Sequence, residues 1–496
     1  MRNIGLTALF ILLSCDPYAP FTKDKIINTS PDAVLIKSIT PPYGGNCGIN
    51  RVVLRGQNLS PDPGVTQVFF GGTPAEVLEV AADRILAVAP NSSKDAPEKV
   101  QVVVKQNDQI IDNETPEPLF YFYRNTVLDF KPPIRVTVGG TQLVDGVNFP
   151  RTLAVGNFAG ESTPDLAWVV GERVHILEAT SIASYTTDGT AFNGIAKPLS
   201  PTIQMTSLAA GDLSGSGFAA LVATSQTKEL LVMHSDGKTI FAIDYLATGS
   251  EPTSVEVGDV DKLGLNDIFY TNSDSNIHLF RNNINIKGRF DTSQQEDLPT
   301  GKNLPVAVAY DQISKTGYAV TSTFDAPFTL GIFDIRNSLS GYIAQSLRTI
   351  STQSRANPNS LAAGDLDADG EPDFVVTHAV SGGAGGFAGI TLYLSGAVGK
   401  RVIGVPVPSG LSQAVLADMN GDGLPDVVAE TLGERPLVMV NEGSGAFSCF
   451  DYNVHRERGD WSGLGALAVV RDPGNHRDGV IVAAYGQAEV RVFWAR

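Results

Sequence analysis

Residues 365–373 read DLDADGEPD and lie between two short runs, SLAA at 360–363 and FVVT at 374–377. The same order of apolar run, acidic turn and second apolar run recurs along the chain. Its turn residue falls at Asn157, Asp212, Asp259, Asp311, Asp365, Asp418 and Asp472, at spacings of 47 to 55 residues. A fixed period of this length marks a repeat protein. Seven units of short apolar runs predict a seven-bladed β-propeller, an all-β fold.

The last unit is one strand short. After Asp472 only two apolar runs follow, at 480–484 and 490–494. An unpaired blade edge would leave a ladder of unsatisfied backbone groups. We therefore expect residues 141–148, just before the first unit, to supply the missing strand, so that the propeller spans 140–496.

Two of the acidic loops carry full sets of oxygen ligands at positions 1, 3, 5 and 9. These are Asp365, Asp367, Asp369 and Asp373 in one loop, and Asp418, Asn420, Asp422 and Asp426 in the other. Such groups repel one another in a tight loop unless a hard cation lies between them, and Ca²⁺ takes six to eight oxygen ligands. An EF-hand is excluded, because its position 12 requires Glu and here holds Val376 or Ala429. The sequence predicts two calcium sites, with solvated turns that bind no metal as the alternative.

Other loops keep only part of this ligand set. One retains Asp259, Asp261 and Asp267, with Leu263 at position 5. Another retains Asn157, Glu161 and Asp165, with Ala159 at position 3. Both are weaker candidates for calcium. The loops at Asp212, Asp311 and Asp472 have lost more ligands and are expected to be metal-free turns.

With their period and acidic loops, residues 140–496 resemble the FG-GAP and VCBS repeat families, which include the head of integrin α chains. The resemblance implies that the calcium ions are structural and pin hairpins on one face of the propeller. It also implies that ligands dock on the opposite face, where the connections between blades lie. One connection, 455–461, concentrates charge and an aromatic ring, so Arg458, Asp460 and Trp461 are candidate partner contacts.

The region before the repeats predicts a small sandwich. Seven short runs rich in β-branched and aromatic residues lie between turn residues, at 34–39, 51–54, 65–70, 75–80, 85–88, 100–104 and 119–123. Residues 34–124 resemble the IPT/TIG family of immunoglobulin-like domains through the motifs SITP at 38–41, LRGQNL at 54–59, VFFGGTPA at 68–75 and AVAP at 87–90. The resemblance implies a spacer or adhesive module.

The N-terminus has the features of an export signal. Arg2 precedes an apolar stretch at 4–13, too short to span a bilayer, and Leu12-Leu13-Ser14-Cys15 resembles a lipobox. The resemblance implies a signal peptide at 1–14, a lipid on Cys15 and a tether at 15–33. An ordinary secretory signal is the alternative. The predicted location is the bacterial envelope, at the outer membrane or cell surface, whereas Asp16 leaves the inner membrane open.

Composition and motifs limit the classes of function that the sequence supports. The formal net charge of −17 disfavours nucleic acid as a partner, and no serine-hydrolase elbow, zinc-protease motif or phosphate-binding loop occurs. Apart from Cys15, only Cys47 and Cys449 remain, and two separate thiols are favoured over a disulfide. We expect a non-catalytic adhesion or ligand-binding module for a protein or glycan. The alternatives are a scaffold subunit of an envelope assembly and, less favoured, a propeller-type polysaccharide lyase or phospholipase.

Overall fold

The computed structural model describes residues 30–496 with breaks. The longer breaks are 46–50, 93–97, 138–152, 187–191, 199–202, 260–263, 283–286, 291–294, 300–308, 310–317, 323–328, 352–357, 379–388, 396–400, 407–410, 432–436, 452–463 and 485–488, and breaks of one to three residues occur elsewhere. The chain divides into two compact units, Met1–Arg124 and Asn125–Arg496. In the described part of the chain, no helix is both long and apolar enough to span a bilayer.

The first unit is a sandwich of two sheets. One sheet has the order β10-β1-β3-β7-β6, with β1 at Leu35–Thr40, β3 at Arg51–Gln57, β6 at Glu76–Ala81, β7 at Arg84–Val88 and β10 at Asp112–Asn113. The other has the order β2-β11-β8-β4-β5 with β9 beside β8: β2 Tyr43–Gly45, β4 Thr66–Phe70, β5 Thr73–Pro74, β8 Glu98–Gln106, β9 Gln109–Ile110 and β11 Leu119–Arg124. A short 3-10 turn, η1, spans Pro63–Val65. Each of the seven predicted strands overlaps an observed one.

Alternation along these strands forms the core of the first unit. On β8 the residues alternate between half-exposed and buried positions, and Val100, Val102 and Val104 point inward. Beside them in the same sheet, Tyr121 and Tyr123 of β11 are buried in the same cluster. A period of two with one buried face is the pattern of a sandwich strand.

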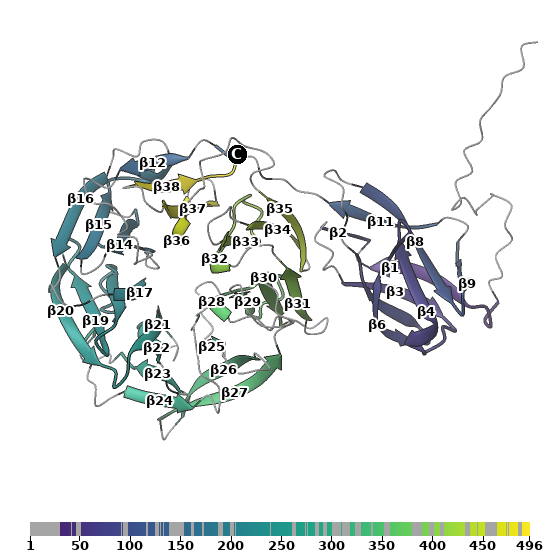
Figure 1. Cartoon of the computed structure of the whole chain (residues 1–496), viewed down its shortest axis with the longest axis horizontal. Helices are drawn as coiled ribbons and strands as arrows, with labels where there is room; N and C mark the ends of the chain where they lie inside the picture. Colours follow the sequence, from purple (N-terminus) through teal and green to yellow (C-terminus); the bar gives the residue numbers. More distant parts are fainter. Residues whose placement is uncertain are drawn as a thin grey trace, which may run out of the picture. The chain divides into compact units, whose positions relative to one another are not determined.

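The second unit is built from sheets arranged around a ring, as Figure 1 shows. Its described residues form seven sheets of three or four antiparallel strands, in which most strands pair with their neighbours in sequence. The fold class predicted from the sequence is therefore confirmed: the chain is all-β, with an immunoglobulin-like sandwich followed by a β-propeller. The helix α1 is limited to Ala183–Thr186.

Six sheets follow one another along the chain, with these bounds. They are β13 Leu153–Gly156, β14 Asp165–Val170, β15 Arg173–Ala179 and β16 Phe192–Pro198; β17 Met205–Gly211, β18 Ala220–Ser225, β19 Glu229–Ser235 and β20 Ile240–Ala247; β21 Pro252–Gly258, β22 Asp267–Asn272, β23 Asn276–Phe280 and β24 Gln295–Pro299; β25 Tyr318–Ser322, β26 Thr329–Ser338 and β27 Gly341–Ser351; β28 Pro358–Gly364, β29 Asp373–His378, β30 Gly389–Leu394 and β31 Arg401–Pro406; and β32 Leu411–Ala417, β33 Asp426–Thr431, β34 Leu437–Gly443 and β35 Ala446–Asp451. We call each sheet of the second unit a blade.

The last blade combines strands from both ends of the second unit. Its order is β12-β38-β37-β36, with β12 at Ile134–Thr137, β36 at Leu464–Asp472, β37 at Arg477–Ala484 and β38 at Glu489–Phe493. The register pairs Val136 with Val490, and both side chains lie in one buried cluster with Trp494.

The strand that closes the ring lies earlier in the sequence than the predicted segment, 141–148. The strand that pairs with β38 is β12, whereas residues 141–148 lie outside the described residues. Two prolines at 132–133 and two glycines at 139–140 flank β12. The apolar run between them is short, so the sequence gives only a weak signal for a strand there. Their position is set by packing, because Val136 is 1% exposed and Ile134 packs against the same cluster.

Candidate functional site

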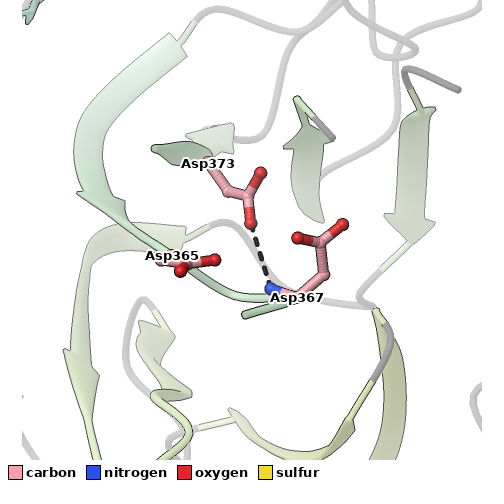
Figure 2. Close-up of side chains that lie close together, drawn as sticks. All are labelled: Asp365, Asp367 and Asp373. Carbon is pink, nitrogen blue, oxygen red and sulfur yellow. Dashed lines mark hydrogen bonds between the residues drawn. The ribbon is translucent and has the colours of Figure 1, made fainter. Parts of the chain in front are cut away.

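The acidic loops connect the first and second strands of their blades. In the first complete loop, which lies between β28 and β29, one carboxylate oxygen each from Asp365, Asp367 and Asp373 lies within 4.8 Å of the others. Figure 2 shows these three side chains around the turn. Asp373 is fully buried, Asp365 and Asp367 are half-buried, and Asp369 at position 5 is exposed. The fold thus brings together three of the four predicted ligands of this loop.

Asp373, at position 9, receives main-chain hydrogen bonds from two directions. Its Oδ2 accepts from the Leu366 and Asp367 N–H groups at 2.7 and 3.2 Å (Figure 2 marks the second), and its Oδ1 accepts from the Ser395 N–H at 2.7 Å. Burial, with smaller contributions from the carboxylates of Asp367 and Asp365, raises the pKa of Asp373 to about 7, against the lowering effect of the hydrogen bonds from Ser395 and Leu366. The loop therefore holds a desolvated carboxylate next to two others, an arrangement that a cation would stabilise.

The second complete loop, between β32 and β33, repeats part of this geometry. Asp426 Oδ2 accepts from the Met419 N–H at 2.9 Å and its Oδ1 from the Asn441 N–H at 2.8 Å. Burial, with smaller contributions from the carboxylates of Asp422 and Asp418, raises the pKa of Asp426 to about 8.

The middle positions of the second loop contact each other. Asn420 Nδ2 donates to Asp422 Oδ2 at 2.9 Å. Among the described residues, only the loop at Asp365 brings three acidic ligand atoms within 4.8 Å. At position 3 the second loop has the amide of Asn420, whereas the first loop has the carboxylate of Asp367.

Position 1 also shapes the turn, with or without a full ligand set. Asp418 Oδ1 accepts from the N–H groups of Gly421 and Asp422 at 2.7 and 3.1 Å. Asp212, in a loop expected to be metal-free, accepts in the same way from Gly215 and Gly217 at 2.8 and 2.7 Å. An acidic residue at position 1 is therefore explained by turn geometry alone.

Position 9 likewise has a structural role in loops with incomplete ligand sets. Asp165 accepts N–H hydrogen bonds from Phe158, Ala159 and Ala179, each at 2.8 Å. Asp267 accepts one from Asn282 at 2.8 Å. Positions 3 and 5 thus separate the two predicted calcium loops from the other turns, because among these loops both positions carry side-chain oxygens of Asp or Asn only in the loops at Asp365 and Asp418.

The two weaker calcium candidates, the loops at Asn157 and Asp259, lie only partly within the described residues. Asp259 accepts an N–H hydrogen bond from Gly264 at 2.9 Å, a turn contact like that of Asp212. Asn157 donates from Nδ2 to the Gly217 carbonyl of the next blade at 3.4 Å. Asp261 and Glu161 lie outside the described residues, as do Cys15, Cys47, Arg458, Asp460 and Trp461.

Asparagines that sequence analysis missed tie the loops of successive blades together. Asn441, on β34, donates from Nδ2 to the Leu366 carbonyl of the preceding blade at 2.6 Å and to the Pro425 carbonyl at 3.1 Å. Asn282, which follows β23, makes the same two contacts, with Leu213 at 2.5 Å and Asn266 at 2.8 Å. The available signal was an Asn soon after the third apolar run of a unit, at 282 and 441.

The loop at Asp418 has a further contact from the final blade. Asp478 Oδ2 accepts from the Asp418 N–H at 2.9 Å, and the Asp478 N–H donates to the Asp418 carbonyl at 2.8 Å. Arg471 Nε pairs with the other carboxylate oxygen of Asp478 at 2.9 Å. The loops at Asp212, Asp365 and Asp418 are thus part of the contacts between neighbouring blades.

A buried histidine in the third blade forms a separate polar cluster. His278 is 2% exposed, with Nδ1 2.7 Å from Asp297 Oδ1 and Nε2 3.1 Å from Asp274 Oδ1. The pKa of Asp297 is lowered, because hydrogen bonds from Gln295 and His278 outweigh the desolvation that would raise it. The imidazole also stacks on Tyr270 at 4.7 Å. These contacts join the turn after β22 to the outer strand β24.

Comparisons with known proteins place the first unit in a family and return low similarity for the whole chain. No curated protein matches the sequence. An auxiliary nutrient binding protein from Bacteroides thetaiotaomicron is 12% identical, with a TM-score of 0.37 over 94% of this chain and 98% of that one. One from Bacteroides ovatus is 14% identical, with a TM-score of 0.36 over 94% and 99%.

A third solved structure matches over a smaller part of the chain. The WD40 domain of Neurospora crassa Pan2 is 9% identical, with a TM-score of 0.45 over 73% of this chain and 95% of that one. A family model matches residues 35–123, close to the predicted bounds of 34–124. Residues 35–123 of this chain are an IPT/TIG domain.

Proposed function

We propose that this chain is a non-catalytic, calcium-binding surface module that is lipid-anchored at Cys15 in the bacterial envelope and binds a protein or glycan ligand. The observation that carries the calcium proposal is the cluster of Asp365, Asp367 and Asp373, whose oxygens lie within 4.8 Å of one another. The anchoring proposal rests on the lipobox-like residues 12–15.

The donor set of the first loop fits calcium. All its side-chain donors are carboxylate oxygens, which hard cations prefer, and the loop offers main-chain carbonyls besides. Each carboxylate oxygen of Asp365 accepts one main-chain hydrogen bond, from Asp369 or Gly370, and has a second lone pair for a cation. Calcium, when bound, would supply a cross-link between oxygens at the two ends of the loop.

The chain's own residues would connect such a site to the propeller. Asp365 and Asp373 fold the turn through main-chain bonds, and Asn441 holds the Leu366 carbonyl from the next blade. An ion that binds only the folded loop stabilises the folded state by mass action. Calcium would thus stiffen a ring whose role is to present ligand-binding loops.

Isothermal titration calorimetry with calcium on three forms of the protein tests this proposal. We expect wild type to bind calcium, Asp367→Asn to lose the site in the first loop, and Glu371→Gln to bind as wild type. Glu371 is a matched control, because it is exposed, lies in the same loop and changes the charge equally, but is not a side-chain ligand. Equal losses in both variants would indicate a general charge effect and contradict a built site.

A further inference from the structure

The outer face of the second IPT/TIG sheet is unusually apolar for a surface. Phe120 and Phe122 of β11 are 36% and 42% exposed, whereas Tyr121 and Tyr123, which alternate with them, are buried. Ile110 of β9 is 49% exposed. These are three of the six large hydrophobic side chains that are exposed among the described residues.

Strand pairing places these side chains on one surface, which we call the aromatic face. Phe122 lies beside Tyr43 of β2 and opposite Lys99 of β8, and Ile110 lies opposite Lys105. Phe69 of β4 faces outward beside Val103. Exposed apolar side chains that gather on one face of a sheet mark an interaction site more often than scattered hydrophobic residues do.

The charge of the aromatic face is opposite to that of the chain. Lys99 Nζ lies 4.0 Å from the centroid of Phe120, and Lys105 Nζ lies 5.0 Å from that of Phe69. No acidic residue occupies an outward strand position among the described residues of this face. In a chain of net charge −17, two lysines on one sheet face favour an anionic partner through charge complementarity.

We propose that the aromatic face binds an acidic glycan, a chain of pyranose rings that carry carboxylates. Such a ligand offers flat C–H faces to Phe120 and Phe122 and anions to Lys99 and Lys105, and it can lie along an open sheet without a pocket. The inference rests on the proposed role in ligand binding and assigns one ligand class to the IPT/TIG domain.

Two other partners fit the face less well. An interfacial membrane contact requires apolar groups buried about 5–10 Å into the lipid, and these rings are more than half covered within a sheet. Protein interfaces favour Arg and are depleted in Lys, whereas the described cations of this face are lysines. A flat polyanion with apolar ring faces remains the best match.

Biolayer interferometry on immobilised polygalacturonate, with dextran as the neutral control, tests the proposal on the full chain. We expect wild type to bind polygalacturonate and not dextran. Phe122→Ser should weaken binding about tenfold, as for the loss of one aromatic anchor. Lys99→Ala should weaken it several-fold and reduce its dependence on salt.

Matched controls come from the other sheet of the same domain. Leu78, on β6, is 38% exposed, and Lys37, on β1, is an exposed lysine. Leu78→Ser and Lys37→Ala should bind as wild type, and circular dichroism should show all four variants folded. Equal binding by Phe122→Ser and Leu78→Ser would overturn the inference while leaving ligand binding elsewhere on the chain intact.

Three further outcomes would also overturn it. These are failure of wild type to bind polygalacturonate, co-sedimentation with phosphatidylglycerol vesicles that Phe122→Ser abolishes, and self-association in analytical ultracentrifugation that the same variant abolishes. The second would assign the face to lipid and the third to a second copy of the chain.

Discussion

Replacing Trp494 with Ala should destabilise the propeller at the contact between its last and first blades. The indole Nε1 donates to the Tyr185 carbonyl at 2.7 Å, across 309 residues of sequence. Trp494 is 5% exposed and lies in a buried cluster with Trp168, Tyr185 and Val136, so its side chain joins the last blade to the first. Loss of a buried Trp side chain costs about 3–5 kcal/mol.

That cost translates into a large change in melting temperature. For large domains a loss of 1 kcal/mol lowers Tm by roughly 2 °C, so Trp494→Ala should lower it by roughly 6–10 °C. Differential scanning calorimetry of the full chain is the suitable assay, because the two units can unfold in separate transitions. The affected transition should be that of the propeller.

An exposed aromatic residue in the same propeller provides the control. Tyr245, on β20, is 44% exposed, so Tyr245→Ala should change stability by no more than about 0.5 kcal/mol. If Trp494→Ala lowers Tm no more than Tyr245→Ala does, the contact between the last and first blades does not hold the ring closed.

Three further predictions concern the blade contacts, a half-buried carboxyl group and the anchor. Asn441→Ala should cost about 1–3 kcal/mol in urea unfolding, because it leaves the buried Leu366 carbonyl without its side-chain donor, and an unchanged midpoint would show that the bridge is dispensable. Burial raises the pKa of Glu256 from 4.5 to about 7, so the folded state binds the proton more tightly and stability should fall as pH rises from about 4.5 to about 7. Glu256→Gln should therefore raise Tm at pH 8 but not at pH 4, and an equal effect at both values would refute the assignment. Cys15→Ser should abolish incorporation of labelled palmitate, and persistent labelling would place the lipid elsewhere.

The sequence was most informative where a local pattern recurs. Acidic turns such as 365–373 and 418–426, each followed by an apolar run, predicted the propeller because each unit folds with the same strand and turn chemistry. The IPT/TIG domain was predictable for the same reason, since its motifs are local. Strand alternation then determined which residues of β8 and β11 are buried.

The remaining features depend on contacts between distant residues. Asn441 lies 75 residues from Leu366 in sequence, so nothing local identifies their bond. Strand β12 was missed because its four residues become a strand only when β38 pairs with them. Positions 1 and 9 of the loops suggested metal ligands, whereas Asp212 and Asp165 show that both positions also serve main-chain turns.

Native mass spectrometry of the purified chain, after dialysis against calcium and then into volatile buffer, tests the central claim most directly. We predict a mass increase equal to about two calcium ions, one for the loop at Asp365 and one for the loop at Asp418. Asp367→Asn should remove one ion, while Glu371→Gln should retain both. A chain that carries no calcium would contradict the account and leave the acidic loops as solvated turns.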